Sequence, residues 1–452
     1  MNPEFYRNLL LELSLHRLIA MPVILLLIYA AAGVGDDSET VSDIAYTVMI
    51  GLLVLWGTRL TADSVLGEVR ARTWDSQRMS GIGPFAMSWA KLLGSTVYVW
   101  YGVALSVPAL LYQWEASLDD LLRVVVLGLY AQAMALLVSL LVQRMRPERL
   151  RFQITASQLL GLSGALVYWN VLFNFNFRAR RRTGETDWYG LIVENETFGL
   201  LSGLVFLGWV CFGIYRLMRA ELQFRSWPVG YTAFVLFCAF YAGGFNPDAA
   251  LKYVNIELSG ALFLLRLLAA FAAVVGLVWL GAYVEPKGFV QLRRFGSSIA
   301  SGRPGRILEA TPGWLPALLV GFVLGGVFLV AWQVSPDARH VIGDSMGMNS
   351  MGAFAVALFL FLLRDIGVIY FLTVDSRAKR GQLTALVYLA ILHVLLPIVL
   401  AVLGLEAALP VLVPYLDGDA LVIVLPVLIQ VGIVGAMLGW RWKRIAGTMA
   451  QT

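Results

Sequence analysis

The chain has 452 residues, of which 59% are hydrophobic and only 14% are charged, and its formal net charge is +5. Soluble domains carry about 45–50% apolar and about 25% charged residues, so this composition excludes a soluble globular protein and leaves no room for a separate soluble domain. The charge is too modest to predict a nucleic-acid partner. The cysteines, Cys211 and Cys238, lie within apolar runs, and His16, His340 and His393 are far apart, so the sequence predicts neither a disulfide framework nor a metal site or cofactor held by this chain.

Apolar runs near the roughly 20 residues needed to cross a bilayer recur along the whole chain. They predict an all-α integral membrane protein, a polytopic bundle of about twelve transmembrane helices. We expect the spans at about residues 18–34, 44–62, 88–112, 121–142, 154–177, 197–218, 229–245, 258–284, 313–333, 350–373, 382–404 and 419–439.

Residues 3–17 precede the first span and have two distinct faces. An apolar stripe that includes Phe5, Leu9 and Leu13 lies opposite polar residues that include Glu4 and Arg7. This pattern predicts an amphipathic helix at the membrane interface. The Ala-rich end of the first span resembles a signal-peptide cleavage site, but the long acidic leader favours a retained span.

Residues 59–91 carry too many charges for lipid and lie between two apolar runs, so they must include a water-facing loop of about 25 residues. Asp63–Ser80 is interrupted only by Gly67, and Glu68 and Arg72 have the spacing of an ion pair on a helix surface. We therefore expect a loop helix that ends at Gly81, Gly83 and Pro84. An ordinary amphipathic helix lying on the membrane would give the same pattern.

The distribution of charge predicts the orientation in the membrane. If the N-terminus is cytoplasmic, most of the 34 Lys and Arg residues lie on the inner side, which is the usual bias. Both termini are therefore expected in the cytoplasm. The cluster Arg178–Arg182 does not fit, because it would lie outside. Either the fifth span re-enters the membrane, or acidic residues such as Glu185 balance the cluster in an outer loop.

Sequence motifs for enzymatic chemistry are absent. No Gly-Lys pair occurs, so the chain has no phosphate-binding P-loop, and no His-Glu-x-x-His or Gly-x-Ser-x-Gly motif is present. An enzyme acting alone is not expected.

Three charged residues fall inside predicted spans: Arg266, Arg364 and Asp365. An unpaired charge in the membrane costs a few kcal/mol or more, so each should have a partner or reach water, and each is a candidate for a functional role. The alternative is that the arginines extend to the membrane surface as structural residues.

A weak repeat links the two halves of the chain. Val97-Tyr98 precedes Pro108 by about the spacing at which Val387-Tyr388 precedes Pro397. We expect a six-span unit over residues 1–220 and a second six-span unit over residues 221–452, which is a candidate degenerate repeat.

The N-terminal half resembles the type 2 permease subunits of ATP-binding-cassette exporters. The resemblance rests on the amphipathic leading helix, two spans, a charged loop helix at about residues 63–82 that contains Glu68-x-Arg70-x-Arg72-Thr73-Trp74-Asp75, and then Ser80, Pro84 and Lys91 before the third span. In that family this loop contains the coupling helix, which docks on a separate ATPase. More usual members have six spans and dimerise, so this chain resembles a fused or extended version.

The resemblance implies a permease subunit in the bacterial inner membrane that exports a hydrophobic, lipid-linked or peptide-like substrate. ATP and magnesium would bind only to a partner P-loop ATPase. The implied docking residues are Glu68, Arg70, Arg72, Trp74 and Asp75, with Trp74 as the apolar anchor. A homodimer or further membrane subunits are open. The second half has no evident coupling helix, although residues 285–309 are long enough to supply one.

Two other functions fit the sequence. A proton-coupled secondary transporter would also have about twelve spans, with Asp365 as its best-placed carboxylate. A non-transporting subunit of a lipid-modifying complex is the third possibility.

Overall fold

The computed structural model describes residues 2–33, 38–111, 118–145, 153–169, 185–224, 227–246, 259–285, 287, 289–346, 348–374, 381–416 and 418–450. Its helices form two compact units. Unit 1 comprises Met1–Thr186 and Val193–Ser226, and unit 2 comprises Asp187–Ile192 and Trp227–Thr452. The boundary near residue 226 lies close to the expected boundary at residue 220.

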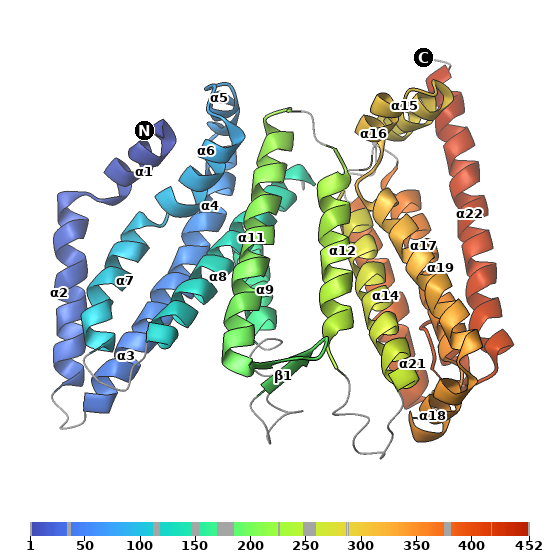
Figure 1. Cartoon of the computed structure of the whole chain (residues 1–452). Helices are drawn as coiled ribbons and strands as arrows, with labels where there is room; N and C mark the ends of the chain where they lie inside the picture. The colour runs from blue at the N-terminus through green and yellow to red at the C-terminus, as the bar shows by residue number, and fades with distance from the viewer. Residues whose placement is uncertain are drawn as a thin grey trace. The chain divides into compact units, whose positions relative to one another are not determined.

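Unit 1 begins with the short helix α1 and continues through the helices of the first six predicted spans (Figure 1). In chain order, its helices are α1 (Pro3–Glu12), α2 (Leu15–Ala32), α3 (Ser38–Ile50), η1 (Gly51–Trp56), α4 (Gly57–Arg70), α5 (Trp74–Arg78), α6 (Pro84–Trp89), η2 (Ala90–Gly94), α7 (Val97–Leu110), α8 (Leu118–Arg144), α9 (Gln153–Trp169) and α11 (Asn195–Glu221). α1 and α5 lie at the same end of this unit.

Unit 2 contains the remaining helices, with α15 and α16 at the end where the chain terminates and α18 at the opposite end (Figure 1). They are α12 (Val229–Gly244), α14 (Ser259–Val284), α15 (Phe289–Ala300), α16 (Pro304–Ala310), α17 (Trp314–Val334), α18 (Pro336–Met346), α19 (Met351–Thr373), α20 (Gly381–Ala390), η5 (Ile391–Leu395), α21 (Leu396–Val402), η6 (Glu406–Val411) and α22 (Ala420–Ala450).

Three elements, η1, η2 and η5, are π-helical turns that continue a preceding α-helix. A π-turn bonds i to i+5, so it widens the helix and shifts its register. In η1, the carbonyl oxygen of Leu53 accepts a hydrogen bond from Gln132 of α8, at 3.1 Å, and that of Leu55 accepts one from Gln158 of α9, at 3.0 Å. The neighbouring spans thus bond to the backbone of this π-turn.

The third predicted span is bent. Pro84–Gly94 meets Val97–Leu110 at an angle of 50°. We call Pro84–Gly94, which consists of α6 and η2, the short limb. The limb follows the charged loop and precedes the bend. Its residues therefore lie on a segment that points in a different direction from α7.

The helical membrane architecture agrees with the sequence prediction. In the described residues nine helices are long and apolar enough to cross a membrane, or ten if the bent pair is one span, and α12 is a shorter apolar helix. Every predicted span overlaps a helix, although α9 is described only to Trp169. The total of twelve spans and the cytoplasmic termini remain predictions, and Arg178–Arg182 lies outside the described residues.

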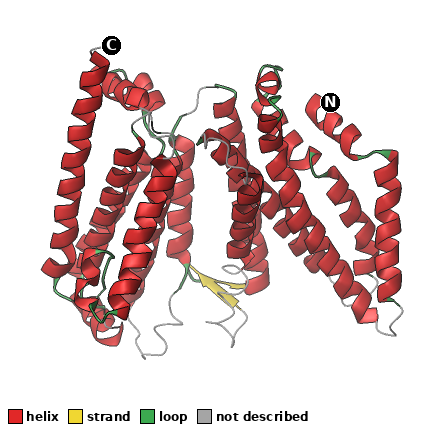
Figure 2. Ribbon diagram, turned by 180° about the vertical axis from the view of Figure 1, so that it is seen from behind, coloured by secondary structure: helices red, strands yellow, loops and turns green. Residues whose placement is uncertain are grey.

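The described part of the chain contains one small β-hairpin, which Figure 2 shows among the helices. Its strands are β1 (Glu185–Trp188) and β2 (Leu191–Glu194). Tyr189 at its turn has a positive φ of 51°, and its hydroxyl donates to the carbonyl of Phe240, at 2.9 Å. The hairpin turn is therefore fixed to the end of α12.

Candidate functional site

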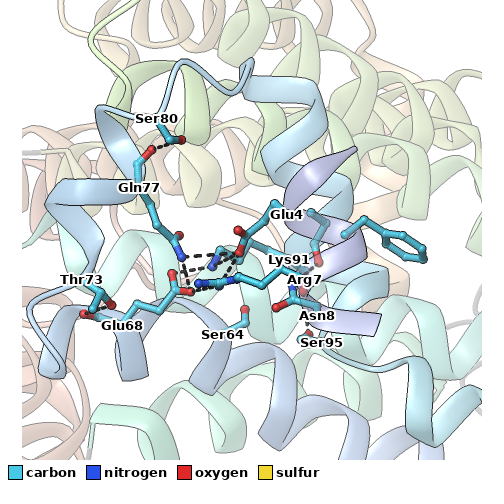
Figure 3. Close-up of polar contacts among 12 residues, drawn as sticks. Glu4, Arg7, Asn8, Ser64, Glu68, Thr73, Gln77, Ser80, Lys91 and Ser95 are labelled. Atoms are coloured by element: carbon cyan, nitrogen blue, oxygen red, sulfur yellow. Dashed lines mark hydrogen bonds and ion pairs between the residues drawn. The ribbon is translucent and has the colours of Figure 1, made fainter. Parts of the chain in front are cut away.

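The charged side chains at the loop end of unit 1 form one connected group, which we call the junction cluster. It joins α1, α4, α5 and the short limb, and it consists of Glu4, Arg7, Glu68, Gln77 and Lys91 (Figure 3). Two carboxylates face two cations, so the formal charges balance. Segments that are up to 87 residues apart in the sequence meet here.

Lys91 is the centre of the junction cluster. Its side chain is 1% exposed, and its Nζ lies 3.1 Å from Oε1 of Glu4, itself 5% exposed. Nζ also forms an ion pair with Oε2 of Glu68. A buried ammonium group must be neutralised by partners because its isolated burial is very unfavourable. Lys91 therefore fixes the short limb to both α1 and α4.

Arg7 completes the cluster from its water-exposed side. Its Nη2 donates to Glu4 at 2.6 Å and to Glu68 at 2.8 Å. Desolvation by burial opposes the charged form, but the hydrogen bond to Glu68 and the charges of both carboxylates outweigh it, so the pKa of Arg7 lies above its ordinary value. Gln77 of α5 donates its amide to Glu68. α5 is thus bound to the same carboxylate as α1 and the limb.

The structure shows how the expected amphipathic helix at the N-terminus is oriented. α1 ends at Glu12, with Asn2 as its N-cap, and α2 begins at Leu15. Its polar residue Glu4 points into the protein, whereas Leu10 and Leu11 are 59% and 64% exposed. The polar face packs on the protein because Lys91 neutralises it there. The exposed leucines are free to meet lipid.

The structure also corrects the single loop helix expected at about residues 63–82. α4 continues out of the second span to Arg70, and the separate helix α5 covers only Trp74–Arg78. Between them Arg72 has a positive φ of 59°, and the N–H of Thr73 donates to the carbonyl of Glu68 at 3.0 Å. This left-handed turn ends α4 before Arg72 can form the expected helical ion pair with Glu68, which binds Arg7 and Lys91 instead.

The expected docking residues divide into buried and exposed groups. Trp74 is 4% exposed and packs in the core of unit 1, so it cannot be the apolar anchor of an exposed surface in this conformation. Glu68 belongs to the junction cluster. The exposed residues are Arg70, Arg72 and Asp75, and Met79, which the sequence interpretation missed, is 81% exposed beside them. Its only sequence signal was an apolar residue among charged ones.

The loop that connects α14 to α17 lies between the second and the third predicted spans of unit 2. The loop after α4 has the same place in the span order of unit 1. The loop of unit 2 contains α15 and α16, which together nearly coincide with the region 285–309 that the sequence offers as a second coupling segment. Both carboxylate oxygens of Glu285 accept the backbone N–H of Gly313, at 3.1 and 2.9 Å. This contact closes the loop at its two ends.

Lys287 anchors the start of this second loop. Its Nζ donates to the carbonyls of Tyr283 and Glu285, at 2.8 and 2.9 Å, at the C-terminal end of α14. Desolvation by burial lowers the pKa of Lys287 to about 8, although the charge of Glu285 opposes this shift.

The intramembrane charges are also placed by the structure. Arg266 of α14 lies under the hairpin turn, 5.6 Å from the ring centroid of Tyr189. Arg364 and Asp365 of α19 form an ion pair of 2.7 Å, and His393 lies within hydrogen-bond distance of both. The sequence interpretation missed His393 because the pairing joins residues 28 positions apart. In the described residues no group of three or more His, Cys, Asp or Glu could hold a metal ion.

No known protein family, curated protein or solved structure matches the chain.

Proposed function

We propose that the chain is the membrane-spanning permease subunit of an ATP-binding-cassette exporter in a bacterial inner membrane, acting with a separate P-loop ATPase. The junction cluster is the observation that carries this proposal. It binds the exposed loop to α1 and to the short limb through buried charges. A force applied to the loop would therefore reach the spans instead of bending a flexible connection.

The exposed part of this loop has the composition of a protein-docking surface. Arg70, Arg72 and Asp75 are exposed in the same loop as Met79, which is a large apolar side chain and is 81% exposed. Interfaces gain most of their affinity from a few apolar or arginine side chains, and the surrounding charges favour one partner over others. Met79 takes the anchor role that the sequence interpretation gave to Trp74.

The loop has features that suit movement after docking. Nε1 of Trp74 and Oε1 of Gln77 are buried without a hydrogen-bond partner among the described residues. Each such group costs roughly 1–3 kcal/mol, which a rearranged loop could recover. The short limb meets α7 at a 50° bend. A rearrangement of the loop could act at this bend as at a hinge and rotate α7 as a rigid body.

An apolar hollow of about 300 Å³ lies beside the short limb in unit 1. It is lined by Phe85, Ser88, Trp89, Leu92, Cys211, Phe212, Ile214 and Tyr215. This lining suits a hydrocarbon chain and supports a hydrophobic or lipid-linked substrate.

The proposal is tested by purifying the tagged full chain gently from its native membrane and assaying the sample for a bound P-loop ATPase. Met79→Asp places a charge at the anchor without removing a buried contact. We expect at least about tenfold less bound ATPase, as for an interface hot spot.

Met79→Leu is the matched control, because it keeps an apolar side chain of similar size and should retain the ATPase. Gel-filtration profiles of both variants should equal that of the unchanged chain. If the intact chain retains no ATPase, the exporter proposal fails. If Met79→Asp retains it fully, the docking surface lies elsewhere, and Leu308→Asp in α16 tests the loop of unit 2.

A further inference from the structure

Four polar side chains meet inside the apolar helices of unit 2. Arg364 and Asp365 come from α19, His393 from the π-turn η5, and Gln430 from α22. The Nε and Nη2 atoms of Arg364 donate to Oδ1 of Asp365, at 3.0 and 2.7 Å, and its Nη1 donates to Gln430, at 2.9 Å. We call these four residues the α19 cluster.

Burial makes the charges of the α19 cluster depend on one another. The side chains of Arg364 and Asp365 are 2% and 6% exposed, whereas that of His393 is 27% exposed. Arg364 and Asp365 neutralise each other, although neighbouring residues on a helix point in different directions, because the guanidinium folds back onto Oδ1. The second oxygen of Asp365 is left for His393.

A single nitrogen of His393 contacts two groups with opposite requirements. Nε2 lies 2.8 Å from Nη2 of Arg364 and 2.8 Å from Oδ2 of Asp365. An arginine nitrogen only donates and a carboxylate oxygen only accepts, so Nε2 must be unprotonated for the first contact and protonated for the second. No tautomer satisfies both contacts at once. The geometry therefore lies between two hydrogen-bonding arrangements.

We propose that His393 is a proton-binding site and that proton uptake moves its ring from Arg364 toward Asp365, so that α20 and η5 shift against α19. In the neutral state, Nε2 accepts from Arg364 and Nδ1 carries the hydrogen. After uptake Nε2 donates to Oδ2 of Asp365, and the imidazolium repels the guanidinium. The inference is independent of the ATPase, since it concerns only side chains of unit 2.

The helix that carries His393 has a break in its regular hydrogen bonding, whereas α22 is in close backbone contact with α19. At Gly367 a Cβ would lie 2.5 Å from a methyl carbon of Val434, so α19 and α22 are in close backbone contact there. The windows Gly381–Val402 and Ala420–Ile445 are each only 11% buried within the chain, but the π-turn η5 interrupts the regular hydrogen bonding of the first. A shift of the histidine ring would therefore move its own helix.

Few other ionisable groups can influence His393. On α19 the charged partners are Arg364 and Asp365, and α22 contributes the neutral amide of Gln430. Tyr388 on α20 is 54% exposed. Two further ionisable groups near α20–α21 among the described residues are Tyr283 of α14, whose hydroxyl donates to the carbonyl of Gln382 at 3.4 Å, and Glu406, which is exposed on η6. The charged groups in direct contact with His393 are thus the two of α19.

The first test follows the histidine ring signals by NMR in the full chain, labelled on histidine and placed in lipid nanodiscs. The chain has only three histidines, so His393→Gln identifies the relevant signal, and His340→Gln is the matched control. We expect this signal to change when the pH is lowered from about 8 to about 5. Asp365→Asn removes the carboxylate that accepts from the protonated ring and should alter this change.

The second test measures the movement. Spin labels at Val402→Cys and Leu421→Cys, positions that are 81% and 70% exposed, report the separation of α21 and α22 after Cys211 and Cys238 are replaced by Ser. The distance distribution should change between about pH 8 and about pH 5 and stay constant in the His393→Gln chain.

Either of two results would overturn the inference. The first is a His393 signal that does not titrate in the unchanged chain, which requires no destabilising variant. The second is a distance change that persists in His393→Gln. Loss of ATPase binding would affect neither measurement, so failure of the proposed exporter function is distinguishable from failure of this site.

Discussion

In each unit a loop follows the second predicted span, after α4 in unit 1 and after α14 in unit 2. The two loops are anchored by different chemistry. The loop after α4 is held by the junction cluster, in which Lys91 is 1% exposed and contacts two carboxylates from distant segments. The loop after α14 is held by Glu285, which accepts the N–H of Gly313, and by Lys287, which caps its own helix. The first anchor joins four elements of unit 1, whereas the second closes only one loop.

This difference indicates how each loop would respond to a partner. A loop tied to α1 and to the short limb transmits a displacement to several helices. A loop closed at its own base can move as a local flap. We therefore expect force transmission to depend on unit 1 much more than on the α15–α16 loop, even if both loops contact a partner.

Removing the ammonium group of the junction cluster should have the largest effect. Lys91→Met leaves Glu4 and Glu68 with only Arg7 as a cation, and breaking a buried pair in this way costs about 3–5 kcal/mol of unfolding free energy. Thermal unfolding of the purified chain, followed by tryptophan fluorescence, measures the loss.

The double variant Lys91→Met/Glu68→Gln restores the charge balance. It should therefore be more stable than Lys91→Met alone. A double variant that is less stable would contradict charge imbalance as the cause of the loss.

Lys287 should make the unfolding free energy of unit 2 rise with pH in the alkaline range. Its folded pKa of about 8 lies below the ordinary 10.5, so below pH 8 the lysine is protonated in both states and the full burial penalty is present. Above pH 8 the folded state loses the proton first, so stability rises, by about 2 kcal/mol near pH 9.5.

Thermal unfolding at a series of pH values measures this slope. Lys287→Met cannot titrate and should lack the rise. An equal rise in both chains would assign it to other groups.

Weakening the anchor at Glu285 should have a smaller and more local effect. In Glu285→Gln the amide oxygen can still accept the N–H of Gly313, but the charge assistance is lost, so we expect a loss of about 1 kcal/mol. Hydrogen exchange should become faster in α16 and near Gly313. Faster exchange in α1 or α4 would show that the two loops are coupled. It would contradict the expectation that the loop of unit 2 moves only locally.

Relieving the left-handed turn at Arg72 should give the smallest change in stability. Arg72→Gly removes the penalty of a φ of 59° on a residue with a Cβ, and we expect a gain of up to about 1 kcal/mol. The same change should weaken ATPase retention, because it removes an exposed cation of the proposed surface. A more stable chain with unchanged retention would exclude Arg72 from docking.

The sequence predicted the helices well and the site only in part. Apolar periodicity located every span that the structure describes because lipid imposes one length and one pattern on a crossing helix. It also identified the segment around Glu68 and the charged pair on α19. It could not predict that Glu68 faces Lys91 instead of Arg72, because this depends on where α4 ends.

Long-range pairing explains the remaining differences. Glu4 lies on the polar stripe of an amphipathic helix, and that pattern does not reveal its buried partner Lys91, which is 87 residues away. His393 likewise acquired a role only through Asp365 on another helix. In both cases one partner lies in a π-turn, which apolar periodicity cannot reveal.

The π-turn η1 has a consequence for the evolution of this chain. Each π-turn is equivalent to one residue inserted in an α-helix, and its wider turn leaves carbonyl groups without their usual partners. Gln132 and Gln158 donate to the carbonyls of Leu53 and Leu55 and so keep them away from lipid. In homologous chains we expect a one-residue gap within Gly51–Trp56 to coincide with the loss of both glutamines, because the three features are useful only together.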